Sequence, residues 1–343
     1  MADEPADRPA TTTDLVLEGG GVKGIALVGA AKALAAAGYS FARVAGTSSG
    51  AMVAAILAAL GRAGEPVNRL EDIALTLDYR KFRDRGFPGE LLGPLGVVTE
   101  AISVVVEDGA YEGDYLRDWV KGVLADLGVH TFGDLHTDDP DDDGTMHHRY
   151  RLVVTASDVS RHRLALLPWD YPDYGLDPDE QLVCDAVRAS ASMPYFFEPV
   201  QLKGPHGTAT LVDGGLVSDY PISTFDRRDG ASPRWPTIGV RVDATHRDGR
   251  PEHLTPVQHP VRMGIALVET AIEGCQAEHT LDPCNIDRSI RVDTQGFPSF
   301  DFDLTEAQKQ EMVAHGRRAT GRFLESWDFD AWRKRCRASA GGD

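Results

Sequence analysis

The sequence lacks an apolar run long enough to cross a bilayer, and it has little positive charge. Its longest apolar run, AMVAAILAAL at residues 51–60, has ten residues, about half the length of a spanning helix. The 35 basic residues are outnumbered by 53 acidic ones, and the formal net charge is −18. This argues against nucleic acid as a partner, because neutralising phosphates requires a basic surface. An anionic bilayer would also repel the chain, but salt screens this repulsion beyond about 8 Å, so a local basic or apolar patch would still allow transient peripheral contact with a membrane.

The four cysteines, Cys184, Cys275, Cys284 and Cys336, are scattered and form no CxxC pair. This spacing argues against a zinc site and a disulfide framework, and it predicts reduced thiols in a cytoplasmic protein. The first thirteen residues, MADEPADRPATTT, are polar and acidic and have no apolar core. They predict a flexible tail over residues 1–13 rather than a signal or transit peptide.

Residues 138–144, DDPDDDG, resemble the start of a calcium-binding loop. The twelfth position of such a loop needs a bidentate glutamate, whereas this chain has Tyr150 there, and a strand is expected next instead of a helix. We therefore expect a solvent-exposed loop here. The sequence implies no metal and no cofactor.

The N-terminal part of the chain has the pattern of a strand, a helix and a second strand. Residues 15–17 are apolar, residues 24–37 carry small and apolar side chains at helical spacing, and residues 41–45 are a second strand candidate. The crossover is long enough for parallel pairing, so the carboxyl ends of both strands should meet at one edge of the sheet. This α/β pattern makes residues 19–24 and 46–50 neighbours.

Further elements follow along the chain. Strands are expected over residues 150–155 and 236–243. A further strand is expected in ATLVDGGL, whose apolar part ends at Asp213. A closing helix is expected over residues 305–327 with Thr305 as its N-cap. Between the first and later strands, residues 61–136 have helical patterns broken by Gly and Pro, which fit either a cap or lid or a buried connection.

The stretch GTSSG matches G-x-S-x-G with Ser48 at its centre, between a strand and a helix. A nucleophile elbow is a strained strand-to-helix turn, so Gly46 and Gly50 must lack side chains for the chain to close around Ser48. The helix that follows points its free N–H groups toward the serine oxygen and favours negative charge there. We therefore predict that Ser48 is a catalytic nucleophile.

The stretch GGGVKG offers bare amides where the first strand ends and a helix begins. The tetrahedral intermediate of acyl transfer needs two or three N–H donors about 3 Å from its oxyanion, and side chains would obstruct them. We expect this loop to form an oxyanion hole from Gly19, Gly20, Gly21, Val22, Lys23 and Gly24. Lys23 could add positive charge or anchor the loop.

A competing interpretation of the same glycines is nucleotide binding, because Gly19, Gly21 and Gly24 also fit G-x-G-x-x-G. No G-K-[ST] follows, which excludes a P-loop. The acidic residue that a dinucleotide site needs near the end of the second strand is absent, since Arg43 is the only charge in residues 41–46. A nucleotide-binding regulatory module on a hydrolase scaffold is therefore the weaker alternative.

The stretch LVDGGL places Asp213 at the end of an apolar strand, and Gly214 and Gly215 after it let another backbone approach closely. We expect Asp213 at the same sheet edge as Ser48. An aspartate is a weak base, so a direct hydrogen bond between the two in a dry cleft would have to supply much of the driving force.

A Ser-Asp-His triad acting on thioesters or peptides is the alternative within the hydrolases. Its histidine would be His246, His253 or His259. None of the three stands in a distinctive sequence context.

Taken in order, GGGVKG, GTSSG and DGG resemble the three motifs of the patatin-like phospholipase family. AVRASASMPYFFEPV at residues 186–200 is similar to the family's segment between elbow and base. The resemblance implies a three-layer α/β/α sandwich with a mostly parallel central sheet, a Ser-Asp dyad without histidine, and hydrolysis of acyl esters of lipids. By this resemblance Ser48 is the nucleophile, Asp213 the base and residues 19–24 the oxyanion hole.

The resemblance also sets the expected domain organisation and reaction. Residues 14–330 would form a single patatin-like hydrolase domain with a helical, cap-like insertion around residues 61–136, and residues 331–343 would be a C-terminal tail. The expected partner is a lipid substrate. The expected reaction is phospholipase A-type cleavage of carboxylic ester bonds through an acyl-enzyme intermediate.

Overall fold

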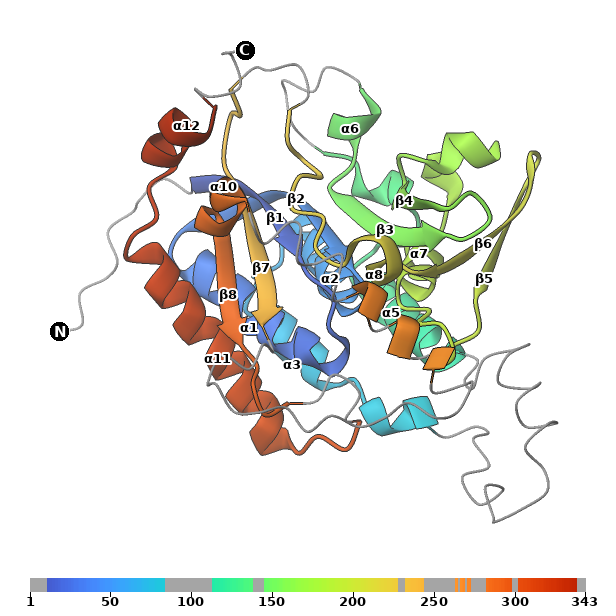
Figure 1. The fold of residues 1–343 in the computed structure, drawn as a ribbon, viewed down its shortest axis with the longest axis horizontal. Helices are drawn as coiled ribbons and strands as arrows, with labels where there is room; N and C mark the ends of the chain where they lie inside the picture. The colour runs from blue at the N-terminus through green and yellow to red at the C-terminus, as the bar shows by residue number, and fades with distance from the viewer. Residues whose placement is uncertain are drawn as a thin grey trace.

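The computed structural model describes residues 11–83, 113–137, 145–227, 232–243, 263–264, 266–268, 270–272, 282–297 and 302–337. Strands in this part of the chain form one eight-stranded sheet in the order β5-β6-β3-β2-β1-β7-β8, with β4 paired to β3 off this path (Figure 1). The strands are β1 (Thr11–Leu17), β2 (Tyr39–Thr47), β3 (Leu152–Asp158), β4 (Arg163–Leu167), β5 (Val200–Gly204), β6 (Gly207–Asp213), β7 (Thr237–Asp243) and β8 (Ser289–Asp293).

The sheet is mostly parallel, as predicted. Strands β3, β2, β1, β7 and β8 run parallel to one another, while β4, β5 and β6 pair antiparallel with their neighbours. Strand β1 begins at Thr11, which pairs with Tyr39, so the last three residues of the expected N-terminal tail belong to the sheet. Threonine is β-branched and favours an extended backbone, which explains why TTT continues the apolar strand.

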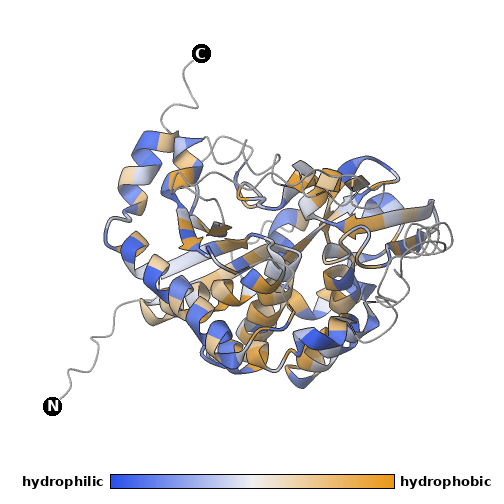
Figure 2. Cartoon of the chain, turned by 60° about the horizontal axis from the view of Figure 1, so that its bottom comes forward, coloured by the Kyte–Doolittle hydropathy of each residue, from blue (hydrophilic) through white to orange (hydrophobic). Residues whose placement is uncertain are grey.

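Helices flank the sheet and give the expected mixed α/β fold. They are α1 (Gly24–Ala36), α2 (Ser49–Ala63), α3 (Arg69–Leu75), α5 (Asp114–Asp126), α6 (Met146–Arg149), α7 (Val183–Ser190), α8 (Gly215–Ser218), α10 (Pro283–Asp287), α11 (Glu306–Leu324) and α12 (Phe329–Arg337). The 3₁₀ turns are η1 (Gly21–Lys23), η2 (Tyr79–Arg83), η3 (Phe132–Leu135), η4 (Tyr171–Tyr174) and η5 (Pro178–Glu180). Figure 2 shows a layer of helices below the sheet, with their apolar residues turned inward.

Helix α2 lies at the centre of the fold. It contacts β1, β2 and β3 and also packs against α1, α3, α5 and α7. A helix surrounded in this way must be apolar on all sides, and its residues 50–60 are all buried. The longest apolar run of the sequence is therefore a core helix. Across the described ranges, no helix is long and apolar enough to span a bilayer.

Helices α1 and α11 cross at very close range because each has a glycine at the contact. A Cβ on Gly316 would lie 2.0 Å from the carbonyl oxygen of Ala26, and a Cβ on Gly29 would lie 2.0 Å from the carbonyl oxygen of Val313. A side chain at either position would push the two helices apart. This contact fixes α11 against the helix that follows the glycine loop.

A disulfide that the cysteine spacing did not indicate holds the C-terminal helix. Cys284 of α10 and Cys336 of α12 are bonded, with their Cα atoms 5.7 Å apart, and the indole N–H of Trp332 donates to the carbonyl oxygen of Cys284 at 2.9 Å. The expectation of reduced thiols is wrong for this pair, because its members are 52 residues apart in sequence and only folding brings them together. Cys184 is a buried free thiol, and Cys275 lies outside the described residues.

The C-terminal boundary also differs from the expected one. Helix α12 continues to Arg337, so the segment expected as a tail begins as a helix that the disulfide ties to the domain. The preceding helix α11 starts at the predicted N-cap, where the Thr305 hydroxyl accepts the N–H of Gln308 at 3.3 Å.

The segment expected as a cap-like insertion is helical where it is described. It contains α3, η2, α5 and η3, and α5 packs against α2 and α7. Its glycine-rich middle, residues 86–96, and the acidic loop at residues 138–144 lie outside the described residues. Within the parts of the chain that the structure covers, no cluster of His, Cys, Asp and Glu could hold a metal ion.

The glycine contact between α1 and α11 predicts that Gly316→Ala destabilises the protein by about 1–3 kcal/mol, because the added methyl group meets backbone. Gly321→Ala in the same helix is the matched control, since nothing lies within 4 Å of its Cβ position. That control should be neutral or stabilising by about 0.5–1 kcal/mol. Thermal and urea unfolding of both variants check this, and equal effects would contradict the proposed close contact.

The disulfide predicts that Cys284→Ser with Cys336→Ser lowers the free energy of unfolding by about 2–4 kcal/mol, because the bond constrains a long loop of the unfolded chain. Urea unfolding of the oxidised proteins measures this difference, and a reducing agent should abolish it. Thiol titration of the unfolded, unreduced chain should find at most two of the four cysteines free. Four free thiols would show that the bond does not form in solution.

Candidate active site

Ser48 stands in a strained turn between β2 and α2. Strand β2 ends at Thr47, α2 begins at Ser49, and Ser48 between them has φ 52° and ψ −121°. A positive φ is costly for a residue with a side chain. Close packing of the flanking glycines holds it, since a Cβ on Gly46 would lie 2.3 Å from the carbonyl oxygen of Gly50. The serine is thereby held ahead of a helix N-terminus at the end of the sheet.

Strand β3 brings the ends of β2 and β6 together. Thr155 of β3 pairs with Thr47 of β2, and the next residue, Ala156, pairs with Asp213 of β6. Strand β4 pairs with both Thr155 and Ala156. Because a strand has only two sides, β2 and β6 must share the other side of β3 and meet there end to end.

This arrangement puts Ser48 and Asp213 in direct contact. The hydroxyl of Ser48 donates to Oδ2 of Asp213 at 2.7 Å, and Oδ1 of Asp213 accepts the N–H of Gly215 at 2.8 Å. A Cβ on Gly214 would lie 2.7 Å from the carbonyl oxygen of Thr155, so the turn after Asp213 fits only without a side chain. Asp213 shares the sheet edge with Ser48 as expected, but it arrives on a strand antiparallel to β3.

Burial changes the acidity of Asp213, which is only 5 % exposed. Its pKa rises from 3.8 to about 7, mainly because burial desolvates the charged form and secondly because of the negative charge of Asp219. Hydrogen bonds from Gly215 and Ser48 act in the opposite direction. The carboxyl group can therefore both accept and return a proton near neutral pH.

Three of the six glycine-loop residues already use their amides within the backbone. The N–H of Gly19 donates to the carbonyl oxygen of Asp219 at 3.1 Å, and that of Lys23 donates to Gly20 at 3.2 Å. The N–H of Gly24 donates to carbonyl oxygens of the η1 turn. These three residues therefore shape and anchor the loop.

The other three amides of the loop belong to Gly20, Gly21 and Val22, and none of them has an acceptor within the described residues. Gly20 has φ 154° and Gly21 has φ 59°, conformations that residues with a side chain rarely adopt. The loop thus presents consecutive free N–H groups at the end of β1, next to the start of α1.

The glycine loop lies directly against the serine. A Cβ on Gly19 would be 3.3 Å from the Cβ of Ser48 and 2.0 Å from Oδ1 of Asp219. Glu18, just before it, anchors the loop to β7, because its carboxylate accepts Nε–H of Arg241 at 3.0 Å and a backbone N–H of β7 at 2.6 Å. Burial, opposed by Arg241, raises the pKa of Glu18 to about 8.

Ser190, at the C-terminal end of α7, links the elbow to the strand that carries Asp213. Its Oγ accepts the N–H of Ser48 at 2.8 Å, and its carbonyl oxygen accepts the N–H of Gly214 at 3.2 Å. The carbonyl oxygen of Ser192 accepts the N–H of Asp213 at 2.8 Å. No local pattern in the sequence marks Ser190, and only the family resemblance pointed to its segment.

Asp219 is a second buried carboxylate beside Asp213, and the sequence analysis missed it. It is 5 % exposed, and its negative charge raises the pKa of both Asp213 and Glu18. Helix α8 separates it from Asp213, so the only signal in the sequence was a second aspartate shortly after DGG.

The three histidines considered for a triad, His246, His253 and His259, lie outside the described residues. Within the described residues, the carboxylate of Asp213 accepts hydrogen bonds from Ser48 and Gly215, and no histidine contacts it. The contact between serine and aspartate is therefore direct.

Comparison with known proteins places these features in a family. The family model described as patatin-like phospholipase matches residues 15–226, which include the glycine loop, the elbow and the DGG turn. YqhO, an uncharacterized protein of Bacillus subtilis (strain 168), is 34% identical over 316 residues, which cover 92% of this chain and 99% of YqhO.

Two solved structures match the chain at low sequence identity. VipD from Legionella pneumophila has a TM-score of 0.51 at 17% identity, over 93% of this chain and 67% of VipD. ExoU from Pseudomonas aeruginosa, solved in complex with SpcU, has a TM-score of 0.46 at 18% identity, and the match covers 93% of this chain but about half, 52%, of that chain. By the extent of the family match and the identity to YqhO, the chain belongs to the patatin-like phospholipase family.

Proposed function

We propose that this protein is a serine lipid acyl hydrolase that cleaves carboxylic ester bonds of phospholipids through a Ser48–Asp213 dyad. The observation that carries the proposal is the 2.7 Å hydrogen bond between the two side chains, beside a loop with free amides. Membership of the family supports a lipid as the substrate. Transient contact with a membrane surface would deliver it.

In the acylation step, Oγ of Ser48 attacks the ester carbonyl carbon while Asp213 takes the hydroxyl proton. The negative charge that develops on the carbonyl oxygen would be stabilised by the free amides of Gly20, Gly21 and Val22 and by the N-terminus of α2. When the intermediate collapses, Asp213 gives the proton to the leaving alcohol, and the acyl group stays on Ser48.

In the deacylation step, Asp213 takes a proton from water, which attacks the acyl carbon. The fatty acid leaves, and the proton returns to Oγ of Ser48. The same carboxyl group thus acts as base and acid in both steps. A pKa of about 7 suits this double role, because a group with a pKa near the working pH is an efficient proton carrier.

The six loop residues do not take the same part in this proposal. Gly19, Lys23 and Gly24 have amides engaged in the backbone, so they hold the loop, while Gly20, Gly21 and Val22 supply the donors. Gly46, Gly50, Gly214 and Gly215 support the elbow and the base by their lack of side chains.

The first prediction for this mechanism concerns the two reacting groups. Ser48→Ala and Asp213→Asn should each reduce release of fatty acid from phospholipid or p-nitrophenyl esters by about three orders of magnitude or more, because nucleophile and base act as a unit. Ser49→Ala is the matched control, since the hydroxyl of Ser49 is buried without a hydrogen-bond partner within the described residues. Ser49→Ala should keep its activity and should still be labelled by a fluorophosphonate probe. Full activity of Ser48→Ala would refute the mechanism.

Two further measurements separate the alternatives. Alanine replacement of His246, His253 and His259 in turn should leave kcat unchanged if the dyad acts alone. Loss of activity in one of them would favour the triad. Nucleotide binding at the glycine loop, without fluorophosphonate labelling of Ser48, would favour the regulatory module.

The second prediction concerns pH. Since Asp213 must be ionised to act as a base, kcat/KM should rise with pH through the pKa of about 7 and level off above it. Asp219→Asn removes a negative neighbour that raises this pKa, so it should shift the acid limb of the pH profile to lower pH. An unchanged profile in Asp219→Asn would contradict the electrostatic role of Asp219, and a purely structural effect would lower kcat/KM equally at all pH values.

A further inference from the structure

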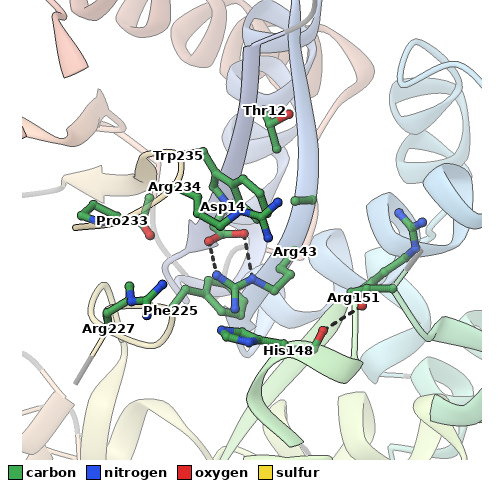
Figure 3. A pocket seen from close by; sticks show the side chains of 13 residues that line it. Thr12, Asp14, Arg43, His148, Arg151, Phe225, Arg227, Pro233, Arg234 and Trp235 are labelled. Atoms are coloured by element: carbon green, nitrogen blue, oxygen red, sulfur yellow. Dashed lines mark hydrogen bonds and ion pairs between the residues drawn. The ribbon is translucent and has the colours of Figure 1, made fainter. Parts of the chain in front are cut away.

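A pocket lies around Asp14 of β1, Arg43 of β2 and the segment before β7 (Figure 3). Ser48 lies beyond the carboxyl end of β2. The pocket is a cavity of about 620 Å³, within the range of pockets that hold small molecules. The residues around it come from β1, β2 and the first residue of β7, from the residue before β3 and from the segments before β7, together with Thr137 and His148. None of the sequence motifs singled out above contributes to it.

The strand register gathers the charged residues of this pocket into one row. Asp14 of β1 pairs with Arg43 of β2 on one side and with Thr237 of β7 on the other. Val44 pairs with Leu152, so the preceding residues, Arg43 and Arg151, are next to each other in the same row. Paired residues point to the same face of a sheet, which is why these side chains line one cavity.

The charge of the lining is opposite to that of the chain. The chain has a formal net charge of −18, yet Arg43, Arg151, Arg227, Arg234 and His148 line this cavity. Among its described lining residues the only acidic one is Asp14. All the strongly basic groups are arginines, whose planar fork matches the oxygens of a phosphate better than a lysine ammonium does.

Two of these guanidinium groups are held in place before any ligand binds. Arg43 donates from Nε to Oδ1 of Asp14 at 3.0 Å and also bonds the other carboxylate oxygen, and its guanidinium lies 4.6 Å from the ring centre of Phe225. Arg234 lies 4.5 Å from the ring centre of Trp235. Because Asp14 occupies the fork of Arg43, Arg43 orders the wall of the pocket. Arg234 is ordered by its contact with Trp235, and an ordered side chain loses less conformational entropy when an anion binds.

We propose that this cavity, which we call the arginine pocket, binds the phosphate group of a small phosphorylated molecule. Arg43 lies in β2, and Ser48 directly follows this strand, five residues later, a span of about 16 Å at the rise of a strand. The arginine pocket is therefore separate from the ester-cleaving site and from the glycine loop, and it does not depend on the proposed hydrolase function. Its phosphate could come from a soluble metabolite or from a lipid headgroup, which share the same recognition chemistry.

Isothermal titration of the full chain with inorganic phosphate and pyrophosphate tests the soluble source. Saturable binding should weaken by about tenfold or more in Arg227→Ala/Arg234→Ala, because charge-assisted hydrogen bonds are lost. Arg80→Ala/Arg317→Ala removes the same charge at exposed positions outside the pocket and should leave binding unchanged. Ser48→Ala should also bind normally, which separates this test from that of the hydrolase.

Flotation with phosphatidylcholine vesicles, with and without phosphatidic acid, tests the lipid source. Binding that needs phosphatidic acid and is lost in Arg227→Ala/Arg234→Ala would assign the phosphate to a headgroup. Thermal unfolding checks that the double variant folds. Arg234→Lys, which keeps the charge but loses the fork, provides a milder variant and should weaken binding several-fold. If neither probe binds the wild type, or if both variants bind as the wild type does, the proposal is wrong.

Discussion

The site depends on one feature of the sheet, which is that β2 and β6 meet end to end along the same side of β3. On this side of β3, Thr155 pairs with Thr47 of β2, and the next residue, Ala156, pairs with Asp213 of β6. Ser48 follows directly after Thr47, so the serine and the carboxylate come into hydrogen-bond contact without a long side chain or a flexible loop. A one-residue slip of β6 would turn Asp213 to the other face of the sheet.

Burial around this junction raises the pKa of its carboxyl groups, at a cost in stability. Asp213, Asp219 and Glu18 are all buried, and desolvation is the largest cause of the raised pKa of Asp213 and of Glu18. A buried carboxyl group with a raised pKa makes the folded state less stable as pH rises from the group's ordinary pKa to the raised one, which for Asp213 is from 3.8 to about 7. Two hydrogen bonds to Ser190, from the backbone N–H groups of Ser48 and Gly214, hold the ends of β2 and β6 together despite the cost of burying these carboxylates. The close glycine contacts act in the same way.

The parts that could be predicted from the sequence are those with a local physical signature. GTSSG between an apolar strand and an apolar helix predicts a tight turn whose flanking positions must be glycine. The structure has this turn, with Ser48 at its centre at φ 52°. Thr305 before a helical pattern predicts an N-cap, which is present. The direction of β6, the buried Asp219 and the hydroxyl of Ser190 at the elbow had no such signature, because each depends on residues distant in the chain.

The pair Cys284 and Cys336 and the arginine pocket illustrate the same limit. Their members are far apart in sequence, and only the packing of α12 on α10 and the register of β1, β2 and β7 bring them together. The sequence by itself determined the α/β class, the elbow, the glycine loop and the aspartate after a strand, because short-range sterics and periodicity specify these. Only the tertiary structure decided which amides are free, which charges are neighbours and how acidic Asp213 is, because those properties arise from burial and from distances between remote segments.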